Sequence, residues 1–262
     1  MIDPGQHLAQ MRAAAPLVQN MTNYVAMNVM ANVMLAAGAS PAMVHAEEEA
    51  PEFAAIASAL TINIGTFSAP WARAMLKTAA AARAAGRPWV LDPVAVGATA
   101  YRREIGAQLL AQRPSVVRGN ASEILALSGR AVAGKGADSV DEVASAEAAA
   151  SRLALNHGMV VAVTGAVDFV TDGTRAVRIS NGHDMMPRIT ALGCSLTGLV
   201  GAFVASQPAF GATVAAISYF GLAGEIAGRN SSGPASFQVA LIDALYSLTP
   251  EELDQGARIA PA

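Results

Sequence analysis

The chain has 262 residues, of which 53% are hydrophobic and only 14% charged, and its formal net charge is −3. This composition excludes a disordered protein, which would need few apolar residues and a high net charge, and the lack of a basic excess argues against nucleic acid as a partner. The single cysteine excludes a disulfide framework and a cysteine-rich zinc site, and it favours the reducing cytoplasm.

Short apolar runs alternate with Ala-rich segments of helical character along the chain. The runs that predict strands are Pro16–Gln19, Ala42–His45, Leu60–Ile64, Trp89–Leu91, Ser115–Val117 and Met159–Val163, and a later pair, Asp168–Thr171 and Arg175–Ile179, flanks Asp172-Gly173 as a hairpin. The segments that predict helices are Val25–Ala37, Pro51–Ala59, Pro70–Ala85, Tyr101–Gln112, Ala121–Leu127, Val140–Asn156, Ser195–Ala205, Ala209–Gly228 and Ala235–Leu248. Apolar strands that alternate with helices indicate an α/β fold with a mostly parallel central sheet and helices on both faces.

The longest uncharged stretch runs from Ile189 to Gly224 and is broken near its middle by Gln207-Pro208. It predicts two buried helices rather than a membrane span, which would need about 20 apolar residues in a row. The N-terminus lacks the pattern of a secretory signal. Because no repeat or linker divides the chain, we expect one domain over residues 1–262, with 254–262 as a frayed tail.

Polar or glycine residues follow each strand-like run. These residues are Asn20-Met21-Thr22-Asn23, Asn63-Ile64-Gly65, Asp92-Pro93, Arg118-Gly119-Asn120 and Thr164-Gly165. In a parallel sheet the carboxyl ends of the strands share one edge, where ligands bind, so these residues would converge there. The sequence therefore predicts a site for a polar, phosphorylated ligand. The alternative is that polar residues follow strands only because loops are polar.

A second candidate feature is the glycine-containing turn that leads through Gly193 and Cys194 into an apolar helix. The free N–H groups at such a helix start attract anions, and the same field would lower the pKa of the Cys194 thiol. The alternative is a small buried cysteine that only packs at a helix start.

Asp92 and Glu123 are the acids most suited to a hard cation such as Mg²⁺, which uses one or two carboxylates together with waters and phosphates. Glu123 has a competing role, because its spacing from Asn120 is that of a capping box, as is the spacing of Ser139 and Glu142. Walker A, Rossmann and H-E-x-x-H patterns are absent from the sequence. A phosphate site without a P-loop points away from the commonest nucleotide folds.

Several blocks resemble, in order, the hydroxyethylthiazole kinase family from about residue 15 to 248. They are Met21-Thr22-Asn23, Gly38-Ala39-Ser40-Pro41-Ala42-Met43, Leu91-Asp92-Pro93-Val94-Ala95-Val96-Gly97, Arg118-Gly119-Asn120-Ala121-Ser122-Glu123, Val163-Thr164-Gly165, Gly193-Cys194 and Gly233-Pro234-Ala235-Ser236-Phe237. The resemblance implies a ribokinase-like fold, phosphorylation of 5-(2-hydroxyethyl)-4-methylthiazole with ATP and Mg²⁺ in thiamine salvage, and homotrimers with active sites at the subunit interfaces.

The resemblance also assigns roles to individual residues. Asn23 and Met43 would hold the thiazole, and Arg118 and Thr164 would contact ATP. Asp92 and Glu123 would organise Mg²⁺ and its waters, which gives Glu123 a second role beside the cap.

Gly193 and Cys194 would surround the transferring phosphoryl group, with Cys194 where related sugar kinases place an aspartate base.

One departure concerns the substrate side of the turn. The family usually has Gly-Thr-Gly-Cys, whereas this chain has Ala191-Leu192-Gly193-Cys194. Glycine at the first position would approach the substrate or adopt a positive φ, and Ala191 adds a methyl group there.

Three alternatives remain open. One is a ribokinase-like kinase for another small alcohol such as a hydroxymethylpyrimidine. Another is a hydrolase that uses Cys194 or Ser195 with His183, and the third is a thiazole-binding protein that has lost catalysis through Ala191 and Leu192.

Overall fold

Nine strands form one sheet in the part of the chain that the computed structural model describes, residues 2–129 and 140–262. They are β1 (Leu17–Met21), β2 (Ser40–Ala42), β3 (Ala59–Asn63), β4 (Trp89–Asp92), β5 (Val116–Asn120), β6 (Val160–Thr164), β7 (Asp168–Thr171), β8 (Ala176–Ile179) and β9 (Ile259–Pro261). Their order is β2-β1-β3-β4-β5-β6-β7-β8-β9. The pairs from β2 to β6 are parallel, and those from β6 to β9 are antiparallel. The predicted parallel sheet and hairpin are confirmed.

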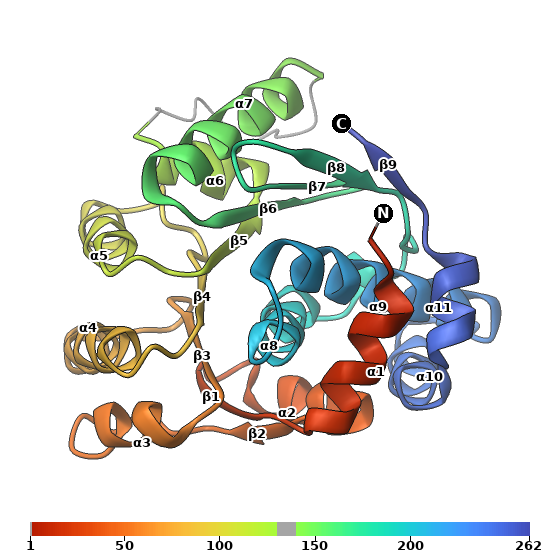
Figure 1. Cartoon of the computed structure of the whole chain (residues 1–262), viewed down its shortest axis with the longest axis horizontal. Coiled ribbons are helices and arrows are strands. Elements are labelled where there is room, and N and C mark those ends of the chain that lie inside the picture. Colours follow the sequence, from red (N-terminus) through yellow and green to blue (C-terminus); the bar gives the residue numbers. More distant parts are fainter. Residues whose placement is uncertain (1, 130–139) are drawn as a thin grey trace.

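Helices cover both faces of this sheet, as predicted. They are α1 (Pro4–Ala14), α2 (Met27–Ala37), α3 (Ala50–Ile56), α4 (Ala69–Ala84), α5 (Ala100–Ala111), α6 (Ala121–Leu127), α7 (Val140–His157), α8 (Leu192–Val204), α9 (Ala209–Arg229), α10 (Pro234–Ser247) and α11 (Pro250–Gly256), with a short 3₁₀ helix η1 (Met186–Arg188). One apolar core lies under α3 to α7, and a second lies between the sheet and α1, α2 and α8 to α11. Figure 1 shows the sheet curving around α8 and α9.

Helix α9 is long and apolar enough to cross a membrane by length and composition alone. However, 78% of its apolar 18-residue window is buried inside the fold. The helix therefore belongs to the core, in agreement with the two buried helices predicted for this uncharged stretch.

Some predicted boundaries are wrong for identifiable reasons. The strand predicted at Ala42–His45 lies at Ser40–Ala42, where Pro41 is tolerated because β2 is the edge of the sheet and Pro has no N–H to donate. Helix α8 begins at Leu192 rather than Ser195, so Gly193 and Cys194 belong to its first turn. The cap predicted at Ser139 lies outside the described residues.

The prediction also missed the regular structure at both ends of the chain, namely α1 at the start and α11 and β9 at the end. Asp3 caps α1, whose first residue is Pro4, a position that favours proline because its N–H would be unpaired there. The tail 254–262 is not frayed: α11 begins with a capping box at Thr249, and β9 pairs with β8. Arg258 fixes the tail, because its guanidinium pairs with Glu225 at 2.5 Å and its N–H donates to Asn181 Oδ1 at 2.7 Å.

Two buried polar pairs link β1, β3 and β4 side by side. Asn20 is the register partner of Thr61, whose hydroxyl donates to Asn20 Oδ1 at 2.7 Å. Asn63 is the register partner of Asp92, and its Nδ2 donates to Asp92 Oδ2 at 2.7 Å. The second pair places an amide and a carboxylate at the carboxyl edge of the sheet.

Candidate active site

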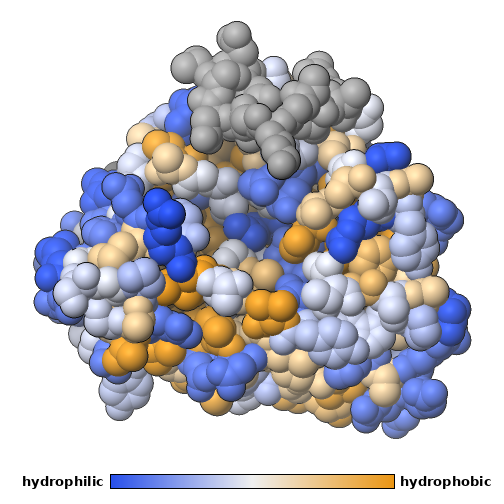
Figure 2. Space-filling model, turned by 180° about the vertical axis from the view of Figure 1, so that it is seen from behind, coloured by the Kyte–Doolittle hydropathy of each residue, from blue (hydrophilic) through white to orange (hydrophobic). Residues whose placement is uncertain are grey.

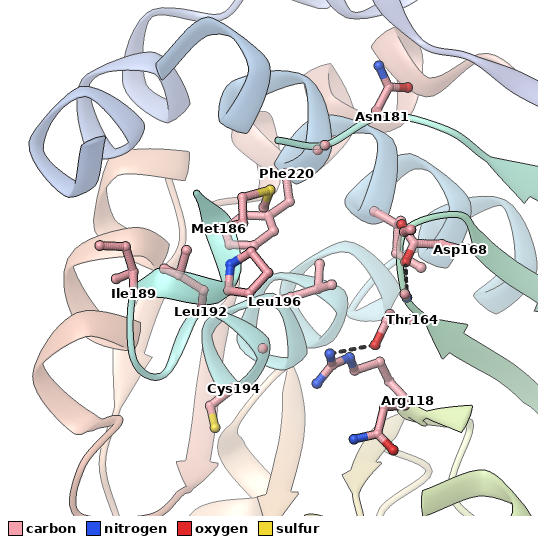
Figure 3. Close-up of a pocket in the computed structure, with 18 of the residues that line it drawn as sticks. Arg118, Thr164, Asp168, Asn181, Met186, Ile189, Leu192, Cys194, Leu196 and Phe220 are labelled. Carbon is pink, nitrogen blue, oxygen red and sulfur yellow. Dashed lines mark hydrogen bonds between the residues drawn. The ribbon is translucent and has the colours of Figure 1, made fainter. Parts of the chain in front are cut away.

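The residues predicted to converge at the sheet edge do converge there. Asp92 ends β4, Arg118 lies near the end of β5 and Thr164 ends β6, and all three line a cavity of about 700 Å³. Gly193 and Cys194 line the same cavity from the start of α8. Figure 2 shows one face of the molecule hollowed near its centre, with hydrophilic surface deep in the hollow, and Figure 3 shows the lining side chains.

Asp92 is fully buried and is held from three sides. Its Oδ2 accepts hydrogen bonds from Asn63 Nδ2 at 2.7 Å and Thr197 Oγ1 at 2.9 Å, and Arg118 Nη1 lies 3.7 Å away. Its Oδ1 is buried and has no hydrogen-bond partner in the described part of the chain. Burial raises the pKa of this carboxyl, although Arg118 and the two donors act in the opposite direction. One oxygen is thus left over for a ligand.

Arg118 lies between the carboxylate and the helix start. Its Nη2 donates to Thr164 Oγ1 at 2.6 Å (Figure 3). A Cβ atom on Gly193 would lie 3.0 Å from Arg118 Nη1 and 3.1 Å from Nη2, closer than nine in ten real Cβ contacts. The lack of a side chain at Gly193 is therefore what allows the guanidinium to lie against the first turn of α8.

The backbone N–H groups at the start of α8 have no hydrogen-bond partner in the part of the chain that the structure describes. Its N-cap, Ala191, has φ 65° and ψ 6° and offers no side-chain hydrogen bond, and the first helical bond is that from Ser195 N to Ala191 O at 2.8 Å. Of the two reasons given for a glycine at this position, close approach to the substrate or a positive φ, the structure shows the positive φ, and an alanine, which disfavours the left-handed region, adopts it. The N–H groups before Ser195 form the positive end of the helix dipole, which favours the binding of anions.

Cys194 is held by two side-chain amides. Asn23 Nδ2 and Asn63 Nδ2 each donate to its Sγ at 3.2 Å. The predicted lowering of the thiol pKa is wrong: burial and the negative charge of Asp92 together raise it, and they outweigh both the amide donors and Arg118. Cys194 is therefore a neutral thiol at pH 7.

Glu123 does form the predicted capping box with Asn120, and it also reaches a second loop. Its Oε2 accepts from Asn120 N and its Oε1 accepts from Ala95 N, both at 2.9 Å. Burial and the charge of Asp92 raise the pKa of its carboxyl. The two acids thus lie near each other at the cavity. Among the described residues, no group of three or more His, Cys, Asp or Glu side chains is arranged so that it could hold a metal ion by itself.

Asn23 and Met43 do not line the cavity of this single chain. Asn23 is 6% exposed, and its amide is engaged with Asn63 Oδ1, Cys194 and Ala26 N. Met43 follows β2 and packs, partly buried, against the core that contains α2. Ala191, by contrast, does line the cavity.

The sequence reasoning missed Asp168 as a site residue. It begins β7, which runs antiparallel to β6, so the start of β7 lies at the same edge as the ends of the parallel strands. Its Oδ1 accepts from Gly165 N at 3.0 Å, and the side chain lines the cavity close to Thr164 (Figure 3). Burial raises the pKa of Asp168 to about 6, against the effects of Gly165 N–H and Arg118. The turn before a hairpin, Gly165-Ala166-Val167, was the available indication.

An apolar wall faces these polar groups. It comes from η1 and from the buried side of α9, with Met186, Ile217 and Phe220 among the lining residues. Figure 3 shows Met186 and Phe220 on one side of the cavity and Arg118, Thr164 and Asp168 on the other. The cavity therefore offers a charged region and an apolar region to one ligand.

Comparison with known proteins gives consistent matches over the whole chain. The sequence model of the hydroxyethylthiazole kinase family matches residues 8–251. A hydroxyethylthiazole kinase of Cereibacter sphaeroides is 67% identical over 258 residues, 98% of each chain, and one of Rhizobium johnstonii is 62% identical over 261 residues, 99% of this chain and 98% of that protein.

Solved structures agree with these sequence matches. The hydroxyethylthiazole kinase structure from Pyrococcus horikoshii has a TM-score of 0.92 and 39% identity, with both chains fully covered. A pyridoxal kinase from Staphylococcus aureus in complex with ADP has a TM-score of 0.63 at 15% identity and covers 95% of this chain and 100% of its own, which shows a shared fold.

Proposed function

The chain belongs to the hydroxyethylthiazole kinase family and has the ribokinase-like fold, and on that premise we propose the reaction that its site carries out. ATP transfers its γ-phosphoryl group to the hydroxyl of 5-(2-hydroxyethyl)-4-methylthiazole, with Mg²⁺, in thiamine salvage. A small-molecule kinase is favoured over a hydrolase, which would need His183 as a base beside its nucleophile. His183 lines the cavity but makes no hydrogen bond with Cys194 or Ser195 among the described contacts.

The observation that carries the proposal is the meeting of three phosphate-binding features. The Arg118 guanidinium, the Thr164 hydroxyl and the uncapped start of α8 lie together on one side of the cavity. Phosphoryl transfer passes through a loose transition state, so catalysis depends mainly on positioning and on stabilising negative charge. A guanidinium held against free backbone N–H groups provides both.

The charges that line the cavity favour a cation beside the nucleotide. Asp92, Glu123, Asp168 and Asp184 line it, whereas Arg118 is the only lysine or arginine among the described lining residues. ATP would bring further negative charge, so the site fits a divalent cation. Asp92, whose Oδ1 is unpartnered, and Glu123 offer the oxygen ligands that Mg²⁺ prefers. When bound, Mg²⁺ would neutralise charge on the phosphates.

Cys194 would orient the acceptor hydroxyl beside the γ-phosphoryl group. A neutral thiol is a weak base, but in a loose transition state the attacking oxygen carries little new charge, so strong base catalysis is not needed. The hydroxyl proton would leave as the new P–O bond forms, to an oxygen of the transferred phosphoryl group, while ADP departs. The amides of Asn23 and Asn63 fix the sulfur, so the hydroxyl would meet it in one position.

The thiazole would be held by Asn23, Met43 and Ala191. Because Asn23 and Met43 do not line the cavity of one chain, we propose that the pocket is completed at the interface of a homotrimer. We also propose that the protein acts in the cytoplasm, as its single cysteine favours.

A coupled ADP-release assay tests the reaction, with controls that omit the thiazole or the metal. ADP release that depends on both supports the proposal and shows that Ala191-Leu192 is tolerated. ADP release with a hydroxymethylpyrimidine but not with the thiazole would show that the proposed substrate is wrong. Thermal stabilisation by the thiazole without turnover would overturn catalysis and leave a binding protein.

A further inference from the structure

Arg102 binds the two loops that carry the polar centre of the site, yet it lies outside the cavity. It stands in the first turn of α5, whose N-cap Thr99 accepts from Arg102 N–H at 3.2 Å. Its Nη1 donates to Ile64 O at 2.5 Å and Val94 O at 2.9 Å, and its Nη2 donates to Gly65 O at 2.6 Å. Ile64 and Gly65 belong to the loop after β3, and Val94 belongs to the loop after β4.

The guanidinium is also fixed by an aromatic surface. It lies 5.1 Å above the ring centre of Phe67, which belongs to the loop after β3. The Phe67 ring stacks on Tyr101 at 5.2 Å between centres, with 11° between the planes. No carboxylate pairs with Arg102 among the described residues. Its charge is therefore satisfied by backbone carbonyls, which makes it a connector between loops rather than half of an ion pair.

The loop after β3 transmits this restraint to Asn63. The peptide of Gly65 is held at both ends, because its O accepts from Arg102 and its N–H donates to Asn63 Oδ1 at 2.9 Å. The loop also passes tightly against Asn23: a Cβ atom on Gly65 would lie 2.9 Å from Asn23 Cβ and Nδ2. A shift of the loop would therefore move both amides that hold Cys194.

We propose that Arg102 is a positioning residue for phosphoryl transfer. By joining the loop after β3 to the loop after β4, it keeps Asn63 in place to hold Asp92 and Cys194 at once. An arginine suits this role because its planar fork of donors reaches three carbonyls in fixed directions, whereas a lysine ammonium is a single point. The catalytic part of this inference rests on the proposed kinase reaction, but the restraint on Cys194 does not.

The test compares Arg102→Gln and Arg102→Lys with Arg103→Gln as the matched control. Arg103 is the next residue of α5 and is exposed, and its side chain donates one hydrogen bond among the described residues, from Nη1 to Gly97 O at 2.9 Å. For Arg102→Gln we expect kcat to fall by about 10²-fold, the effect of a small misplacement of reacting groups. KM for ATP should stay nearly unchanged, because Arg102 does not line the cavity. The kcat of Arg102→Lys should lie between those of Arg102→Gln and the native protein, and the kcat of Arg103→Gln should equal that of the native protein.

A second readout does not depend on turnover. Cys194 is the only cysteine of the sequence, so the rate of its alkylation by iodoacetamide reports on the amides that hold it. We expect the alkylation rate to change several-fold in Arg102→Gln, because the two amides both favour the reactive thiolate and restrict access to the sulfur, and to stay unchanged in Arg103→Gln. Both rates are measured well below the unfolding temperature. If Arg102→Gln does not fold, Arg102→Lys serves for the same comparison.

Unchanged alkylation in a folded Arg102 variant would overturn the proposal, as would an equal change in Arg103→Gln, which would indicate general loosening. A fall in kcat/KM that comes only from a raised KM, with kcat unchanged, would also contradict the proposal. If the native chain showed no thiazole kinase activity, the proposed function would fail, while the alkylation rates would still decide whether Arg102 positions the site.

Discussion

Replacing Asp168 by Asn separates the electrostatic cost of this buried acid from its hydrogen bond. Asp168 is 9% exposed, and its pKa is raised from 3.8 to about 6. That difference corresponds to about 3 kcal/mol, since each tenfold change in proton affinity is about 1.4 kcal/mol. Asn keeps an oxygen that accepts from Gly165 N–H, so the substitution removes the charge and little else.

The sign of the pH dependence follows from which state binds the proton more tightly. Between pH 3.8 and about 6 the folded protein holds the Asp168 proton while the unfolded chain has released it, so this residue makes stability fall as pH rises through that window. Above pH 6 the full cost remains. We therefore expect Asp168→Asn to raise the free energy of unfolding at pH 7.5 by up to about 3 kcal/mol, and the gain to shrink towards zero at pH 4.

Urea unfolding at pH 4, 5, 6 and 7.5, followed by tryptophan fluorescence at one protein concentration, measures this difference. The control is Asp184→Asn, which changes an exposed carboxylate of the same cavity and should stay within about 0.5 kcal/mol of the native protein. A loss of stability at pH 7.5 in Asp168→Asn, or a gain that grows towards acid pH, would refute the reasoning.

Three further predictions concern other parts of the chain. Ala191→Gly should raise the free energy of unfolding by about 1 kcal/mol, because glycine accepts φ 65° without a Cβ clash; an unchanged urea midpoint would contradict this. In the ADP-release assay Cys194→Asp should keep activity, whereas Arg118→Ala should lose about 10²-fold or more; a dead Cys194→Asp beside a fully active Cys194→Ala would exclude a base at that position. Deletion of residues 258–262 should lower the free energy of unfolding by about 1–3 kcal/mol, because the buried Asn181 Oδ1 loses the N–H donor of Arg258. Calorimetry measures this change, and an unchanged melting temperature would support a frayed tail.

The convergence of Asp92, Arg118 and Thr164 could be predicted because it depends only on strand direction. Each follows an apolar run, and the ends of parallel strands share an edge whatever their order in the sheet. Asp168 escaped this reasoning because β7 reverses direction, so that the start of a strand reaches the edge. A rule that considers residues after strands has no means of finding it.

The pKa of Cys194 shows a different limit. The helix start favours a thiolate, and it is visible in the sequence. Burial and the closeness of Asp92 favour the neutral thiol, and they depend on contacts between residues about a hundred positions apart, such as the bond from Thr197 to Asp92. The sign of the shift therefore follows from packing, which no local pattern contains. The positioning role proposed for Arg102 is likewise invisible, because its partners are backbone carbonyls.

The pairing of Asn63 with Asp92 has a consequence for how the sheet finds its alignment. Every residue of β3 and β4 is buried, so the apolar pattern of these strands does not distinguish one alignment from a slip of one or two residues. A slipped β3 would separate Asn63 from Asp92, and Thr61 from Asn20, and so would break the hydrogen bonds that these four buried polar side chains make between strands. Misalignment is thereby penalised at the polar pair that belongs to the proposed active site, where Asn63 holds Asp92. A molecule that folds with the wrong strand alignment would thus be both less stable and inactive.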